Sequence, residues 1–207
     1  MKVGEFSRGG VARGQQAVAA LDHDMHPDAV LTPAGILEVD SHQLNVIFGT
    51  SRDTSDFVAD CLELWWDHRQ HAYPEVRRLL IDLDNGPEIA SSRTQFMKRL
   101  VEFSDRFGLT IELAYYPPYH SKYNRIERCW GILENHWNGT LLSSIETTLS
   151  WAKSMTWRGV APIVHLLDRQ YETGIRLNKS EFRPIQLRLK KSDVLPKWSV
   201  VIPPFLG

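Results

Sequence analysis

The chain has 207 residues, 43% of them hydrophobic, and a formal net charge of −1 at pH 7. A chain of this length and apolar content normally forms one domain with a proper hydrophobic core. It contains no apolar run of about 18 residues and no apolar stretch at its start, so we expect neither a membrane span nor a signal peptide. The charge excludes an overall basic footprint, so local charge is the better guide to anion binding.

The cysteines predict a reducing compartment. Cys61 and Cys129 lie on the apolar faces of separate predicted helices, and they have no CxxC spacing. Without a secretion signal, such cysteines are typical of reduced core residues rather than of a disulfide. We therefore expect a cytoplasmic protein.

Residues 1–28 are rich in Gly, Ala and charged residues and predict a loop, with a short helix near Gln15–Leu21. The pair Gly9-Gly10 argues against other regular structure there. Asp22–Asp28 brings metal-ligand residue types together, but a metal site needs convergent geometry and support from neighbouring side chains. A solvated polar loop is therefore the favoured interpretation of Asp22–Asp28.

From residue 35 onward, the apolar pattern alternates between strand and helix. The predicted strands are Gly35–Asp40 and Leu44–Gly49, joined as a hairpin by Ser41-His42-Gln43, then Val76–Leu83 and Leu109–Tyr115. The predicted helices run from Asp53 or Thr54 to about Gln70, from Ser91 or Ser92 to Gly108, and from Asn124 to Asn138-Gly139. Later elements are predicted as helices over Ile145–Met155 and Val160–Tyr171, and as an edge strand over Trp198–Ile202. This order is an α/β pattern.

Carboxylates lie at the end of the strand Val76–Leu83. Asp84 follows the strand, and Asn85-Gly86 lets the backbone turn away and leave the Asp84 carboxylate exposed. Asp82 lies on the same face of the strand and is its main rival. Because Asp82 lies one residue pair further from the end of the strand, we expect its side chain to be more buried than that of Asp84. Burial of an unpaired carboxylate is costly. We therefore assign Asp82 a structural or supporting role and Asp84 the role of a metal ligand.

Glu127 lies in the first turn of the helix that is predicted to begin at Asn124. At this position it is either a metal ligand or the glutamate of a capping box, and spacing alone leaves both roles open. One carboxylate at a strand end and one at a helix start, both on rigid elements, suit a divalent cation.

Basic residues surround Glu127: His120, Lys122, Arg125 and Arg128. Such a group can bind DNA phosphates, and Arg is the better bidentate partner. A solvated basic face without a ligand explains the same residues, and both interpretations stay open.

These motifs carry a resemblance to a known family. The segments concerned are Leu79-Leu80-Ile81 running into Asp84-Asn85-Gly86, then Tyr116-Pro117-Pro118, Ser121-Lys122-Tyr123-Asn124 and Ile126-Glu127, with Gly4–Gly10 and Tyr171–Ile175. They resemble the catalytic core of bacterial insertion-sequence transposases of the DDE class, and most closely the Rhodopirellula-type transposase DDE domain. The likeness runs over nearly the whole chain.

The resemblance implies an RNase H-like fold, with a mixed sheet flanked by helices. It implies a catalytic core over residues 1–155 and a C-terminal helical or tail extension of the same domain over residues 156–207. It further implies Mg²⁺ or Mn²⁺ held by Asp84 and Glu127, and metal-dependent DNA strand cleavage and strand transfer. The implied partners are the transposon ends and the target DNA, contacted by Lys122, Arg125 and Arg128. Glu88 follows the turn, where related enzymes often carry a polar residue.

The sequence departs from this family at its start. The family's first catalytic aspartate lies on a first strand, upstream of the segment similar to Gly4–Gly10, whereas no aspartate precedes Asp22 here. We expect the first strand and its ligand to be missing, with Asp40 the only substitute in the chain, and we expect the exposed sheet to self-associate. Three functions stay open: a transposase or a piece of one, an inactive remnant with weak DNA binding, and another RNase H-like nuclease.

Overall fold

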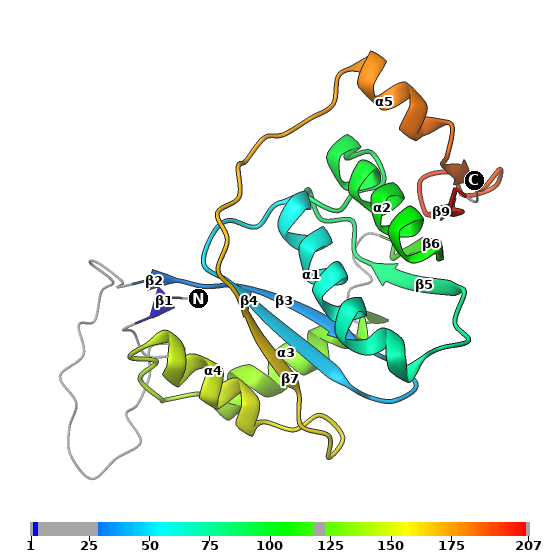
Figure 1. Ribbon diagram of the computed structural model, residues 1–207. Helices are drawn as coiled ribbons and strands as arrows, with labels where there is room; N and C mark the ends of the chain where they lie inside the picture. The colour runs from blue at the N-terminus through cyan, green and yellow to red at the C-terminus, as the bar shows by residue number, and fades with distance from the viewer. Residues whose placement is uncertain (1, 4–28, 118–122, 206–207) are drawn as a thin grey trace, which may run out of the picture. The chain divides into compact units, whose positions relative to one another are not determined.

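The computed structural model describes residues 2–3, 29–117 and 123–205 (Figure 1). The chain forms two compact units, each built from two separate stretches. Unit 1 comprises Met1–Arg52 and Arg125–Gln170, and unit 2 comprises Asp53–Asn124 and Tyr171–Gly207. The helix expected over Gln15–Leu21 and the polar stretch Asp22–Asp28 lie outside the described residues. The division of the sequence at residue 155 stays a prediction.

Unit 1 is built on a mixed sheet with the strand order β3-β4-β7. Its strands are β3 (Thr32–Leu37), β4 (Leu44–Gly49) and β7 (Ile163–Leu167). β3 and β4 form the predicted antiparallel hairpin, and β7 lies parallel to β4. A separate antiparallel pair joins β1 (Lys2–Val3) to β2 (Ala29–Val30). All residues of β4 are buried, as the central position of this strand requires.

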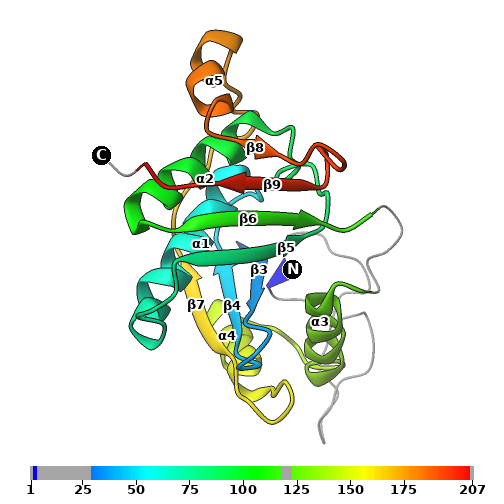
Figure 2. The same ribbon diagram turned by 90° about the vertical axis from the view of Figure 1, so that its right-hand side faces the viewer.

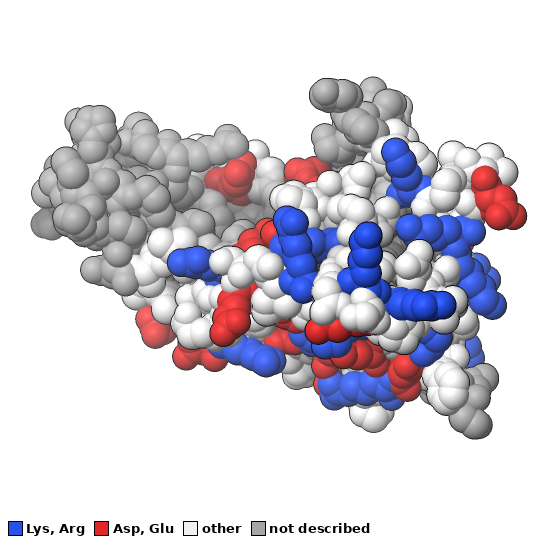
Figure 3. Space-filling model, turned by 90° about the horizontal axis from the view of Figure 1, so that it is seen from above, with Lys and Arg blue, Asp and Glu red and all other residues white. Residues whose placement is uncertain are grey.

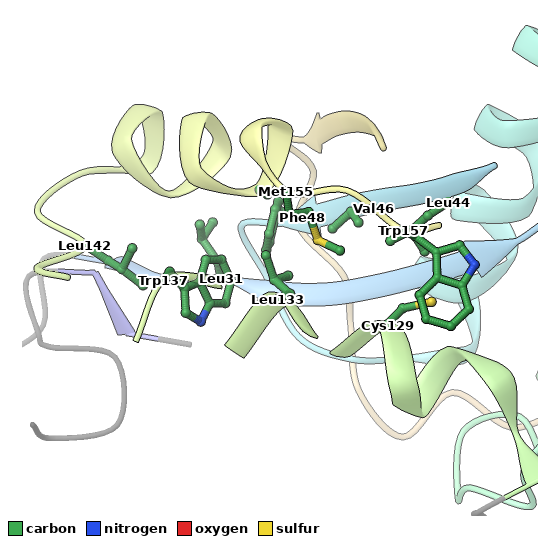
Figure 4. Close-up of a cluster of buried hydrophobic side chains, with 11 residues drawn as sticks. Leu31, Leu44, Val46, Phe48, Cys129, Leu133, Trp137, Leu142, Met155 and Trp157 are labelled. Atoms are coloured by element: carbon green, nitrogen blue, oxygen red, sulfur yellow. The ribbon is translucent and has the colours of Figure 1, made fainter. Parts of the chain in front are cut away.

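Two helices complete the core of unit 1: α3 (Arg125–His136) and α4 (Ile145–Ser154). Leu44, Val46 and Phe48 alternate along β4 and therefore share one face of the sheet. This face joins apolar side chains from α3, α4 and the segments beside them: Leu31, Cys129, Leu133, Trp137, Leu142, Ala152, Met155 and Trp157 (Figure 4). The helices predicted near Asn124 and at Ile145 are confirmed.

The helix predicted over Val160–Tyr171 is wrong, because this segment contains β7. Asn45 of β4 is in register with Ile163, and Gly49 with Leu167. Ile163 and Val164 are β-branched, and such residues favour a strand where a neighbouring strand is available for pairing. Pairing with β4 therefore overrides the helical spacing of the apolar residues.

Unit 2 contains a mixed sheet with the strand order β5-β6-β9-β8, onto which Figure 2 looks. Its strands are β5 (Arg78–Leu83), β6 (Thr110–Tyr115), β8 (Lys190–Lys191) and β9 (Ser199–Ile202). β5 and β6 are parallel, and β9 is antiparallel to both β6 and β8. The expectation of an edge strand over Trp198–Ile202 is therefore wrong in its position: β9 lies inside the sheet, because β8 covers its outer side.

The helices of unit 2 are α1 (Ser55–Arg69), continued by the 3-10 turn Gln70–Ala72, then α2 (Thr94–Phe107) and α5 (Lys179–Gln186). Thr54, one of two predicted caps, begins α1: its hydroxyl accepts the Phe57 N–H at 3.1 Å. Gly108 ends α2 with a φ of +64°, as predicted. The predicted cap at Ser91 or Ser92 is wrong, because Arg93 precedes α2 and the Ser91 hydroxyl instead donates to the Lys197 carbonyl.

A charge cluster joins α1 to α2. The Arg99 guanidinium on α2 donates to Asp56 at 2.8 Å, to Asp60 at 2.6 Å and to Glu63 at 3.0 Å, all on α1. Burial would lower the pKa of Arg99, but the hydrogen bonds to these carboxylates raise it. The Tyr171 hydroxyl donates to the second Asp60 oxygen at 2.8 Å, so the cluster also holds the later part of the chain to α1.

The cysteines are buried and free, as predicted. Burial raises the pKa of Cys129 to about 11. A thiol of that pKa is protonated at neutral pH and behaves as a small apolar core residue.

Candidate functional site

Asp84 lies where the sequence predicts it, directly after β5. Its side chain is exposed, and its Oδ1 accepts the Gly86 N–H at 3.1 Å. This bond turns the backbone away from the strand and occupies only one carboxylate oxygen; within the part of the chain that the structure describes, Oδ2 has no hydrogen-bond partner.

The expected burial of Asp82 is wrong, because its side chain is exposed like that of Asp84. In the described part of the chain, β5 pairs with β6 alone, and this face of β5 also leaves Leu80 62% exposed. The Tyr116 hydroxyl reaches Asp82 Oδ2 at 3.4 Å. Position along a strand therefore says little about burial when the strand face stays exposed, as it does at Leu80 and Asp82.

Asp53 is a neighbour of Asp84 that the sequence did not reveal. Because Thr54 caps α1, the Asp53 carboxylate is not used as the cap. Desolvation raises the pKa of Asp53, and the negative charges of Glu88 and Asp84 raise it further. The sequence gives one signal only, two cap-forming residues side by side where a single cap is needed.

Glu88 is held by its surroundings. Its Oε2 accepts a bond from Arg93 Nη2 at 2.8 Å, and its backbone carbonyl accepts the Ser55 hydroxyl at 2.6 Å. These contacts fix the turn that follows Asp84 against the start of α1. Glu88 therefore contributes negative charge near Asp84 while its own carboxylate is already paired.

Glu127 is the third residue of α3, in unit 1, and its side chain is exposed. It has no hydrogen-bond or ion-pair partner within residues 2–3, 29–117 and 123–205, so these residues offer no capping contact to it. Arg125 and Arg128 are exposed on the same helix, whereas His120 and Lys122 lie outside the described residues. Asp84 belongs to unit 2, so its pairing with Glu127 stays a prediction.

Asp40, the suggested substitute for a first ligand, lies exposed in the turn between β3 and β4. Its neighbour Glu38 is buried and accepts the Ser41 hydroxyl at 2.9 Å. The turn is therefore held by Glu38, and its contacts do not involve Asp40.

The family of the chain follows from its whole length. A family model described as the Rhodopirellula transposase DDE domain matches residues 1–204. The chain belongs to this family. Searches of curated proteins and of solved structures gave no match. Family membership gives this transposase domain a transposase-type function, and it implies interaction with DNA and use of a divalent metal.

The residues of the transposase domain suit a hard metal ion in their chemistry. Asp84 and its neighbour Asp53 offer carboxylate oxygens, the ligands that Mg²⁺ and Mn²⁺ prefer. Desolvation is the main cause of the raised pKa of Asp53, and the charges of Glu88 and Asp84, which a cation would offset, raise it further. Among the residues that the structure describes, no three His, Cys, Asp or Glu side chains already converge as a metal site. The same residues include no helix long and apolar enough to cross a membrane.

Proposed function

We propose that this chain is the catalytic domain of a DNA transposase, which cleaves DNA strands at the ends of an insertion sequence and transfers them to a target. The family match over residues 1–204 is the observation that carries the proposal. The arrangement of helices and two mixed sheets is compatible with an RNase H-like core.

Asp84 and Glu127 are the proposed ligands of Mg²⁺ or Mn²⁺. A bound divalent cation activates a water or hydroxyl nucleophile and stabilises the leaving oxygen of the phosphodiester. The assignment of Asp84 is supported by the exposure of its side chain and by the contact with the Gly86 N–H, which fixes one of its carboxylate oxygens. Glu127 supports its role by its exposure and by the absence of any partner within the described residues.

Lys122, Arg125 and Arg128 are proposed to hold the DNA strand beside this site. Arg125 and Arg128 lie three residues apart on α3, so their side chains leave the same side of the helix. Contacts of this kind position a phosphate backbone without reading bases. Replacing all three residues with Ala should weaken DNA binding equally for every sequence and flatten its salt dependence.

We also infer that the chain self-associates through β5. This strand pairs with β6 alone in the described part of the chain, and Leu80 on it is 62% exposed. An unpaired strand edge with an exposed apolar side chain is a template for pairing with a second copy.

The test of catalysis is cleavage of a labelled transposon-end duplex by the full chain in Mg²⁺ or Mn²⁺. We expect Asp84→Ala and Glu127→Ala to abolish the cleaved product, while Asp82→Ala retains it, since Asp82 shares the strand face but not the proposed role. Cleavage that survives Asp84→Ala would refute the assignment. A chain that binds the duplex but never cleaves it, whatever the metal, would instead be an inactive remnant.

A further inference from the structure

Positive charge is concentrated in the segment that contains α5 and β8. Residues 176–197 contain seven Lys and Arg and two Asp and Glu, which gives this segment a net charge of +5. Since the whole chain has a net charge of −1, the rest of the chain has a net charge of −6. Figure 3 looks down on the face where α5 lies and shows Lys and Arg side chains gathered there. We call this segment the basic arm.

The cations of the basic arm differ from those elsewhere in unit 2. Most arginines of α2 and β5 bind carboxylates, as Arg78 binds Glu112 and Arg99 binds the acidic side of α1. In contrast, a set of exposed side chains in the arm has no carboxylate partner within the described residues: Arg176, Lys179, Arg183, Lys190, Lys191 and Lys197. Their charge is therefore available to an external anion.

The arm is anchored at both ends, so these cations are held in place. At the start, the Leu177 N–H donates to the Thr94 hydroxyl at 3.0 Å. In the middle, Arg188 binds Asp105 with two bonds, of 2.6 and 3.0 Å, and also donates to the Pro203 carbonyl at 2.7 Å. At the end, the Lys197 carbonyl accepts the Ser91 hydroxyl at 3.1 Å. Arg188 thus fixes the arm to α2, while the other cations of the arm are exposed to solvent.

Helix α5 carries its charge against its own stability. It has no buried residue, so packing contributes little, and Lys179 and Arg183 lie one turn apart, where like charges repel. A capping box offsets this cost: Asn178 accepts the Ser180 and Glu181 N–H groups, and Glu181 accepts the Asn178 N–H. An anion bound to α5 would relieve the repulsion between Lys179 and Arg183, which explains why a short exposed helix keeps both cations.

Helix α2 lies beside the start of the arm and adds one cation, Lys98, which also pairs with Glu102 at 3.6 Å. An open groove of about 480 Å³ lies between α2 and the start of the arm, with Lys98 on one side and Arg176 on the other. The apolar side chains of Ile175 and Ile185 also line this groove. The arm thus presents exposed cations beside an open groove rather than a closed pocket for a small anion.

We propose that the basic arm binds the phosphate backbone of duplex DNA, as a contact surface separate from the proposed metal site. The proposal rests on the proposed transposase function. A set of exposed Lys and Arg on anchored elements, without carboxylate partners among the described residues, suits a polyanion, and such contacts position DNA without reading its sequence. The arm therefore adds affinity for DNA of any sequence on the side of unit 2 that carries α5.

The test is equilibrium binding of the full chain to a labelled random-sequence duplex in EDTA. Fluorescence anisotropy measures the binding at several salt concentrations. The test variant combines Lys179→Gln, Arg183→Gln and Lys190→Gln. The matched control combines Arg77→Gln, Lys153→Gln and Arg158→Gln, which removes the same charge from exposed residues outside the arm. Circular dichroism of both variants confirms that they fold.

We expect the arm variant to bind more than about tenfold more weakly, and its slope of log K against log salt to fall by about 0.9 for each phosphate that the arm no longer neutralises. The control should keep the wild-type slope. Equal weakening in both variants, or unchanged binding by the arm variant, would overturn the proposal, as would arm-dependent binding to phosphatidylserine vesicles with DNA binding unchanged. The assay contains EDTA and measures binding alone, so a failure of the catalytic assignment leaves this result readable.

Discussion

Gly35 on β3 packs against the indole ring of Trp130 on α3. A Cβ atom at residue 35 would come 2.6 Å from Trp130 Cζ2 and 2.9 Å from Ile126 Cδ1. Both distances are far below van der Waals contact, so only a residue without a side chain lets α3 approach the strand this closely. Because α3 also carries Glu127, the contact positions a proposed ligand of the metal.

We therefore expect Gly35→Ala to destabilise the protein by about 1–3 kcal/mol, the usual cost of overpacking a filled core. Urea unfolding followed by tryptophan fluorescence measures the change. The control is Gly131→Ala on the same helix, where an added Cβ meets nothing within 4 Å. Ala at a helical position is favoured over Gly, so the control should stabilise by about 0.5–1 kcal/mol. Equal effects of the two substitutions would contradict the close approach.

Arg99 should be the most sensitive charged residue of unit 2. Its side chain is 15% exposed, and Arg99→Met would leave Asp56, Asp60 and Glu63 without their shared cation. Removing one partner of such a buried group costs about 3–5 kcal/mol. Thermal unfolding at low and high salt gives the measurement.

Arg106 provides the contrast. It also binds Glu63 and Asp67, but its side chain is 51% exposed. Exposed pairs contribute about 0–1 kcal/mol, so Arg106→Gln should change stability little. If Arg99→Met proves as mild as Arg106→Gln, the cluster is solvated and does not hold α1 to α2.

Local patterns in the sequence were enough to predict most elements. The stripe with Phe96, Leu100 and Phe103 and the terminal Gly108 predicted α2, because helical periodicity and a left-handed cap are local signals. The segment of β7 was predicted as a helix, because only its parallel partner β4, more than a hundred residues away in the sequence, makes it a strand. Helix α5 was missed, because its residues bury nothing and its pattern is polar.

The candidate site shows the same limit. The strand end and the Asn85-Gly86 turn predicted the exposed carboxylate of Asp84 from adjacent residues alone. The neighbourhood of Asp53, Glu88 and Asp84 could not be predicted, since it depends on how α1 begins relative to the turn after β5. The exposure of Asp82 depends on what covers β5, which is equally a tertiary property.

Self-association through β5 predicts a specific solution behaviour. Leu80→Lys places a charge on the exposed face of the strand, which opposes pairing with a second copy. We expect the variant to shift towards monomer in light scattering coupled to size exclusion, with unchanged circular dichroism. Leu166→Lys on β7, where the leucine is 39% exposed, is the matched control and should leave the association state unchanged. Dissociation by the control alone would place the contact on unit 1.

The charges around Asp84 predict a pH-dependent stability. The pKa of Asp53 is raised from 3.8 by desolvation and by the charges of Glu88 and Asp84, so the folded state holds this proton more tightly than the unfolded state. The protein therefore loses stability as pH rises through the folded pKa of Asp53. Asp53→Asn removes the charge without removing Thr54, the cap of α1. We expect this variant to be more stable than the wild type at neutral pH and equally stable well below pH 3.8.

Asp105 provides a control of opposite sign. Hydrogen bonds from Arg188 lower the pKa of Asp105 below 3.8, so its charge stabilises the fold above that pH and the stability is lost as pH falls through the lowered pKa. Asp105→Asn should therefore be less stable than the wild type at neutral pH, and urea midpoints measured across this range compare both variants.

Mg²⁺ should stabilise the wild type by offsetting the repulsion near Asp84, and Asp84→Ala should reduce this gain. If Asp53→Asn destabilises at neutral pH, the Asp53 carboxylate is paired rather than repelled, and the excess of negative charge around Asp84 is refuted.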